Sequence, residues 1–136
     1  MENNQISLNI YDYIVSKNHD AKDRIAIDYL GRKYTFKELL DNMNIVMQSL
    51  SEYGIKKGDS IMALTLATPE FIFLMYGAAK MGITLNIFNP FNDENYDSII
   101  SRLNPKLLFC YDRFYTKILG KIDNKKIVIT SPFDSL

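Results

Sequence analysis

Only a few side chains in this sequence are of the types that do chemistry. His19 is the single histidine of the chain, and it lies in a polar stretch with no second metal-ligand residue near it. A histidine can act as a general base or as a metal ligand. Without a partner in its neighbourhood, His19 is better interpreted as an exposed loop residue than as a catalytic or ligating one.

The single cysteine, Cys110, falls within the apolar run Leu107–Tyr111. That position favours a buried structural thiol over a nucleophile, because a reactive cysteine needs an electropositive and partly exposed setting. One cysteine also excludes an internal disulfide framework and fits a reducing compartment.

Three acidic residues, Asp93, Glu94 and Asp97, stand at the start of an expected helix. Carboxylates there interact favourably with the helix dipole, so this interpretation is preferred to a paired-carboxylate site. Asn86 lies within an apolar strand and needs a hydrogen-bond partner if it is buried. A satisfied structural amide is the favoured interpretation of Asn86, and an amide facing a ligand cavity is the alternative.

No phosphate-binding loop is visible. The six glycines stand at positions 31, 54, 58, 77, 82 and 120, so neither G-x-G-x-x-G nor a Walker loop occurs. The sequence therefore predicts no catalytic residue, no cofactor-binding residue and no metal ligand in this chain.

Composition limits the remaining classes of function. The chain has 136 residues, 47% of them hydrophobic, which is enough for one domain over residues 1–136 with a sizeable core. Its 16 basic and 16 acidic residues balance, which argues against nucleic-acid binding. The polar N-terminus has no signal-peptide pattern, and the most apolar stretch, 71–81, is shorter than the roughly 20 residues of a transmembrane helix. We expect a cytoplasmic protein without a transmembrane segment.

Two helices have strong boundary signals. Thr35 and Glu38 form a capping-box pattern before an apolar stripe that repeats every three or four residues as far as Tyr53, and Gly54 ends it. Thr68 and Pro69 are suited to the start of a second, deeply apolar helix that Gly82 ends. The small residues 77–79 would allow another backbone to approach this second helix closely.

The strands follow a regular rhythm. Short apolar runs begin near residues 60, 84, 106 and 126, and helices are expected between them, including one capped by Asp93 and one over 112–120. This repeated βαβ pattern predicts an α/β fold with a mostly parallel sheet and helices on both faces. A short helix over 6–15 and a β-hairpin, 25–29 with 33–35 around Gly31, precede it. The tail 131–136 supplies no helix to cover the last strand.

The order of these signals resembles one family, the adenylate-forming enzymes, which include the acyl-CoA synthetases. The resemblance covers about residues 20–130 and rests on five motifs in the family's order and spacing: Tyr34–Leu39, Gly54–Asp59, Thr68–Glu70, Tyr76–Gly82 and Asn89–Pro90. The stretch from Tyr76 to Pro90 is most similar to bacterial fatty-acyl and related acyl-CoA synthetases. The resemblance implies the N-terminal subdomain of the synthetase fold.

It also implies a ligase that joins a small-molecule carboxylate to coenzyme A through an acyl-adenylate, using ATP and magnesium. The family's nucleotide motifs, a Ser/Thr/Gly-rich loop ending in lysine and an aromatic-x-Thr-Glu motif among them, match no stretch of this sequence. We therefore assign none of the family's catalytic residues to this chain. The expected partner of this incomplete N-terminal portion is the remainder of the enzyme.

Two hypotheses follow. The first is a non-catalytic fragment of an acyl-CoA synthetase, whose exposed apolar surface would favour self-association. The alternative is a complete small flavodoxin-like module that binds a ligand or a partner without catalysis. The absence of phosphate-loop glycines makes this alternative the weaker of the two.

Overall fold

The computed structural model describes residues 9–136. From Phe36 to Tyr111 helices and strands alternate along the chain, and η denotes a 3-10 helix. In order they are α1 (Ile10–Lys17), β1 (Ile25–Tyr29), β2 (Arg32–Thr35), α2 (Phe36–Glu52), β3 (Ser60–Leu64), α3 (Pro69–Met81), β4 (Thr84–Phe88), α4 (Tyr96–Leu103), β5 (Leu107–Tyr111), η1 (Asp112–Lys117), η2 (Asn124–Lys126) and β6 (Ile127–Thr130).

The two long helices begin and end where the sequence predicts. At the start of α2, Thr35 and Glu38 form a complete capping box. At its end, Gly54 has a φ of 79° and the N–H of Ile55 donates to the carbonyl of Leu50 over 2.9 Å, which is the hydrogen bond of a Schellman cap. Helix α3 has Thr68 as its N-cap and Pro69 in its first turn, and left-handed Gly82 ends it.

Four strands form a parallel sheet in the order β4-β3-β5-β6. Strand β3 lies inside this sheet, and its residues Ile61, Met62, Ala63 and Leu64 are fully buried. A separate antiparallel hairpin pairs β1 with β2. Its two-residue turn, Leu30–Gly31, has positive φ at both positions (51° and 87°), as a type I′ turn requires.

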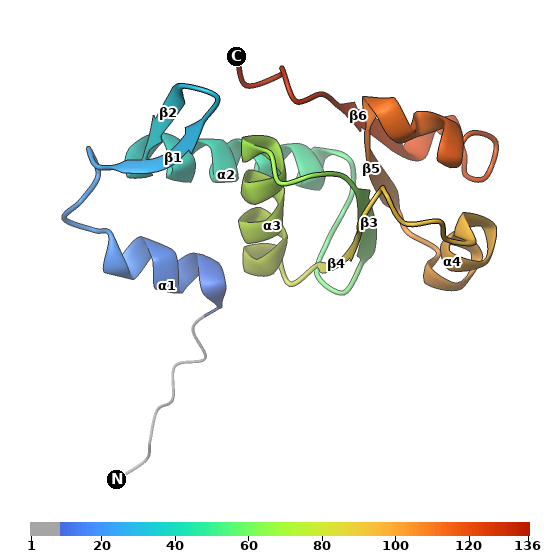
Figure 1. Ribbon diagram of the computed structural model, residues 1–136. Coiled ribbons are helices and arrows are strands. Elements are labelled where there is room, and N and C mark those ends of the chain that lie inside the picture. Colours follow the sequence, from blue (N-terminus) through green and yellow to red (C-terminus); the bar gives the residue numbers. More distant parts are fainter. Residues whose placement is uncertain (1–8) are drawn as a thin grey trace, which may run out of the picture.

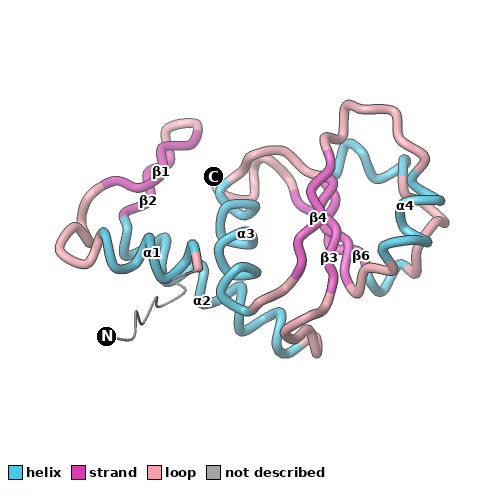
Figure 2. The backbone as a smooth tube through the Cα atoms, turned by 90° about the horizontal axis from the view of Figure 1, so that it is seen from below, coloured by secondary structure: helices cyan, strands magenta, loops and turns pink. Residues whose placement is uncertain are grey.

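Helices cover both faces of the parallel sheet, which confirms the predicted fold class. On one face, Ile61 and Leu107 pack with Leu50 of α2 and Leu74 of α3. On the other face, the side chains come from β3, β5, α4 and the η1 region (Met62, Leu64, Leu108, Cys110, Tyr96, Ile99, Ile100, Phe114 and Ile118). Figure 2 shows the strands between α3 on one side and α4 on the other.

Helix α1 and the hairpin lie on the side of α2 and α3 that faces away from the sheet (Figure 1). Tyr11, Tyr34, Leu39, Met43 and Phe73 form a third apolar cluster there. Two side chains in the first turn of α1 add polar contacts to this packing. The Tyr11 hydroxyl donates to Asn44 over 2.9 Å, and Lys80 pairs with Asp12 at 2.6 Å.

Three details differ from the sequence prediction. The cap of α4 is Asn95 rather than Asp93, because the Asn95 side chain is placed to accept the N–H of Ser98. The predicted helix over 112–120 is a 3-10 helix that ends at Lys117. The first helix, predicted within 6–15, covers Ile10–Lys17 and so extends two residues beyond the predicted end, and positions 6–8 lie outside the described residues.

Candidate functional site

In an open parallel sheet, ligands bind beyond the carboxyl ends of the strands, where the chain changes direction across the sheet. Here the chain passes from β3 to β4 on one side and then returns to β5 on the other side of β3. A ligand site is therefore expected at the segments that follow the strands. They begin at Thr65, Asn89, Asp112 and Ser131.

A cavity of about 270 Å³ opens at this end of the sheet, and we call it the carboxyl-edge cavity. Its walls are largely apolar, with Val46, Phe71, Leu74, Phe109, Val128 and Ile129 from α2, α3, β5 and β6. Its polar lining consists of Thr65, Glu70, Thr130 and Asp134.

Glu70 is the least satisfied polar group in this cavity. The Ser135 hydroxyl donates to its Oε1. Its Oε2 is buried and has no hydrogen-bond partner within residues 9–136. Burial raises the pKa of Tyr29, and the nearby Tyr111 and the Glu70 carboxylate add to that rise. The buried Oε2 of Glu70 therefore lacks a hydrogen-bond donor.

The start of α3 is the helix N-terminus beside this cavity, but it does not fit a phosphate group. Pro69 has no N–H, and the N–H of Phe71 already donates to the Thr68 hydroxyl at 3.4 Å. The Glu70 carboxylate adds a negative charge where a phosphate would need positive potential. No glycine lies in the segment that joins β3 to α3. The start of α3 therefore does not fit the triphosphate of ATP.

The residues present do not fit a magnesium site either. Nowhere in the described part of the chain do three or more His, Cys, Asp or Glu side chains gather as metal ligands. The acidic residues before and in α4 are used as surface partners instead. Asp97 pairs with Lys121, and Asp93 approaches Lys117 at 3.6 Å.

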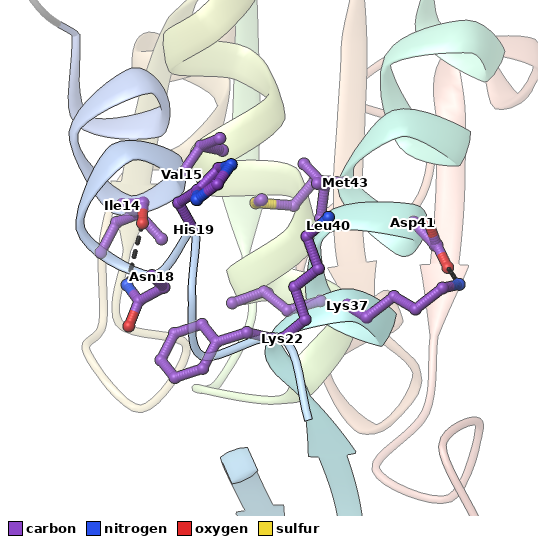
Figure 3. Close-up of a pocket in the computed structure, with 11 residues that line it drawn as sticks. Ile14, Val15, Asn18, His19, Lys22, Lys37, Leu40, Asp41 and Met43 are labelled. Atoms are coloured by element: carbon purple, nitrogen blue, oxygen red, sulfur yellow. Dashed lines mark hydrogen bonds and ion pairs between the residues drawn. The ribbon is translucent and has the colours of Figure 1, made fainter. Parts of the chain in front are cut away.

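A second cavity, of about 300 Å³, lies between α1 and the first half of α2, and we call it the α1–α2 pocket. Figure 3 shows α1 residues such as Val15 on one side of it and α2 residues such as Leu40 on the other. Its apolar walls are Ile14, Val15, Phe36, Leu39, Leu40 and Met43. Asn18, His19, Lys22, Lys37 and Asp41 complete its lining.

Comparison with known proteins identifies the family. The chain matches the AMP-binding enzyme family over residues 16–135. It belongs to that family. The match includes every strand and every helix of the structure except the greater part of α1.

Relatives of this chain are named as CoA ligases and coenzyme A synthetases. The 4-coumarate–CoA ligase 3 of Arabidopsis thaliana is 27% identical over 129 residues, which are 93% of this chain and 23% of that protein. The acetyl-coenzyme A synthetase of Bacillus subtilis is 32% identical over 100 residues, 64% of this chain and 18% of the synthetase. The chain thus spans about a quarter or less of the relatives it matches.

Solved structures of AMP-binding enzymes share the fold. A benzoate CoA ligase from Burkholderia xenovorans LB400 superposes with a TM-score of 0.83 over 92% of this chain and 26% of the ligase, at 14% identity. The anthranilate CoA ligase AuaEII, solved with anthranoyl-AMP, gives a TM-score of 0.79 over 90% of this chain and 25% of its own, at 22% identity. Within these enzymes the chain corresponds to the N-terminal part.

The structure places two polar residues singled out in the sequence, Asn86 and His19, where the sequence predicts them, in a hydrogen-bonded strand and in an exposed turn. The Asn86 amide nitrogen donates to the Ser60 hydroxyl at 2.8 Å and to the Ile61 carbonyl at 3.1 Å, so it is a satisfied structural amide between β4 and β3. The His19 side chain is 77% exposed, contacts Asp20 at 2.8 Å and lies at the mouth of the α1–α2 pocket.

No helix in the described range is both long and apolar enough to cross a membrane.

Sequence reasoning missed the two features that the fold creates from distant segments. Glu70 follows Pro69 at a helix start, where a carboxylate is already explained by the helix dipole. Its unsatisfied oxygen becomes apparent only once Ser135 is folded against it. The α1–α2 pocket likewise depends on how two helices pack, and neither helix carries a local signal for it.

Cys110 is expected to be unreactive in the folded protein. The residue is fully buried, and burial raises the pKa of its thiol to about 11. At pH 8 the thiol is therefore protonated, and a reagent must wait for the structure to open. We expect modification by Ellman's reagent to be at least about 100-fold slower in buffer than in denaturant. Equal rates in the two solutions would contradict the assignment of Cys110 as a structural thiol.

Proposed function

We propose that this chain is the N-terminal part of an ATP-dependent acid–thiol ligase. The complete enzyme would convert a carboxylate and ATP into an acyl-adenylate, and then transfer the acyl group to coenzyme A. The observation that carries the proposal is the family match over residues 16–135. The names of the relatives, a 4-coumarate–CoA ligase and an acetyl-coenzyme A synthetase among them, support this reaction class.

Within such an enzyme these residues would be scaffold rather than catalytic machinery. The segment that joins β3 to α3 carries neither a glycine-rich turn nor a free helix N-terminus for the phosphates. Transfer of an adenylyl group requires donors or cations that offset the charge developing on the phosphates. The remainder of the enzyme, the nucleotide and magnesium would have to supply that environment together.

This proposal predicts no adenylation by the 136-residue chain alone. The chain would be incubated with ATP, magnesium, labelled pyrophosphate and, in turn, acetate, benzoate and 4-coumarate. We expect carboxylate-dependent ATP–pyrophosphate exchange to stay at the background rate. A full-length CoA ligase assayed in parallel provides the positive control. Exchange above background that depends on the carboxylate and on this chain would contradict the scaffold assignment.

The strand order gives some support to the binding-module alternative. Counted from β3, the parallel strands follow the order 2-1-3-4, as in the first part of a flavodoxin-like sheet. The turn that would hold a phosphate in such a module is the one from β3 to α3, and it ends in Pro69 and Glu70. Tight binding of a flavin or nucleotide to the isolated chain would favour this alternative over the ligase fragment.

We also propose that the isolated chain self-associates through the β6 side of the sheet. Strand β6 is an edge strand, and Ile129 on it is 47% exposed. Phe133 and Leu136, in the tail that follows, are 68% and 64% exposed. An open strand edge beside apolar side chains favours pairing with another chain.

Sedimentation velocity over a range of concentrations tests this association. We expect a concentration-dependent dimer whose dissociation constant rises at least about tenfold in Ile129→Lys, because a charge replaces an apolar contact. The matched control is Ile87→Lys on β4, the opposite edge strand, where Ile87 is 53% exposed. A wild-type chain that stays monomeric throughout would rule the association out.

A further inference from the structure

We propose that the α1–α2 pocket binds a small amphiphilic carboxylate, with the apolar tail between the two helices and the carboxylate beside Lys22. All the residues that would form this site lie in the chain itself. The inference is therefore independent of which reaction the proposed ligase catalyses.

The size and lining of the pocket suit a small ligand with an apolar tail. Its volume of about 300 Å³ is at the lower end of the range of small-molecule sites, roughly 300–1,000 Å³, and suits a ligand the size of octanoate. Its deepest walls belong to the apolar core, since Leu39 is 4% exposed and Met43 1%. Removing such a surface from water favours an apolar tail.

The charge at the mouth of the pocket favours an anionic head group. Lys37 and Asp41 form an ion pair at 2.7 Å, so their charges offset each other (Figure 3). Among residues 9–136, no acidic side chain lies within ion-pair distance of Lys22. The His19 ring is already in contact with Asp20. The lining therefore has one cation in excess, and it selects an anionic head group over a cationic or neutral one.

Hydrogen bonds fix the segments that carry Lys22 and Asn18. The N–H of Lys37 donates to the carbonyl of Lys22 at 3.0 Å, which fixes the connecting segment against the start of α2. The Asn18 amide donates to the Ile14 carbonyl at 2.8 Å and keeps a second N–H for another acceptor (Figure 3). A carboxylate can accept hydrogen bonds from an ammonium group and an amide group at once.

The apolar lining, the charge at the mouth and the hydrogen-bonding groups together specify the class of ligand. The apolar walls exclude a small inorganic anion as the preferred ligand, because it would leave them in contact with water. The excess positive charge disfavours an alkylammonium ion. The lysine ammonium is a point charge on a flexible stem, so Lys22 can pair with a single carboxylate at the mouth of the pocket.

The test is a titration of the ¹⁵N-labelled 136-residue chain with octanoate, octylammonium and octanol, followed by amide chemical shifts. We expect saturable binding of octanoate with a dissociation constant below about 1 mM and the largest shifts within residues 14–43. Octylammonium and octanol should bind at least about fivefold more weakly. The spectrum itself shows whether each variant is folded.

Charge reversal makes the test specific. Lys22→Glu should weaken octanoate binding at least about tenfold and make octylammonium the better ligand. Lys22→Gln should weaken octanoate binding without that reversal. Lys125→Glu makes the same charge change at an exposed position on η2, outside the pocket, and should leave octanoate binding unchanged.

Any of four results would overturn the proposal, and the first three concern specificity. They are equal binding of the three ligands by the wild type, shifts centred away from residues 14–43, and equal effects of Lys22→Glu and Lys125→Glu. The absence of saturable octanoate binding would overturn it as well.

Discussion

Leu64→Ala is expected to lower the free energy of unfolding by about 2–5 kcal/mol. Leu64 ends β3, is fully buried, and lies in register with Phe88 of β4 and Cys110 of β5. Its side chain packs in the cluster that holds α4 and η1 against the sheet. Truncation removes its transfer free energy and leaves a cavity between elements that cannot easily collapse into it.

Urea unfolding followed by circular dichroism measures this loss. The matched control is Ile87→Ala, which removes a similar side chain from the edge strand β4, where Ile87 is 53% exposed. We expect this control to cost less than about 1 kcal/mol. Equal losses in the two variants would show that β3 is not the centre of the core.

Gly77→Leu is expected to destabilise the protein by about 1–3 kcal/mol or more. Gly77 is buried in α3 where it crosses α2, and a Cβ at this position would lie 3.2 Å from Met47 Cγ and 3.5 Å from the Met43 carbonyl oxygen. The rest of a leucine side chain would force the two helices apart. The separation would also disturb the packing of α2 and α3 against the sheet.

Gly77→Ala is the comparison that separates close packing from backbone flexibility. Alanine gains about 1 kcal/mol of helix propensity over glycine, and this gain offsets its one tight contact with a side chain that can adjust. We expect a net change within about 1 kcal/mol. If leucine were tolerated as well as alanine in thermal unfolding, the α2–α3 contact would not require a small residue.

The elements with local signals were predictable from the sequence. The ends of α2 and α3 depend on Thr35, Gly54, Thr68 and Gly82. Their side chains or backbone conformations allow the free backbone N–H and C=O groups of the terminal turns to form hydrogen bonds within a few residues. The unbroken apolar run at the start of β3 likewise predicts burial on both faces, because no side of that strand meets water.

Local reasoning failed where two close solutions compete. Asn95 rather than Asp93 caps α4, and both residue types are good N-caps only two positions apart. In the segment 112–120, Phe114 and Ile118 are spaced for an α-helix, yet the chain adopts 3-10 geometry over six residues. Such short connections are determined by the distance they must span as much as by side-chain pattern.

The candidate sites were not predictable because they form between segments far apart in the sequence. Glu70 meets Ser135 across 65 positions, and the Tyr34 hydroxyl donates to the Ser135 carbonyl across 101 positions at 3.4 Å. The α1–α2 pocket arises where two short apolar stripes fail to fill the space between their helices. Neither arrangement leaves a motif in the sequence.

The mass of the native protein tests the central proposal most directly. An antibody raised against residues 9–136 would be used to probe an extract of the cells that produce the protein. Because the chain spans 23% of its Arabidopsis relative, the proposal predicts a band several times larger than the 15.7 kDa of this chain. A single band at 15.7 kDa would contradict the ligase-fragment proposal and favour a complete small binding module.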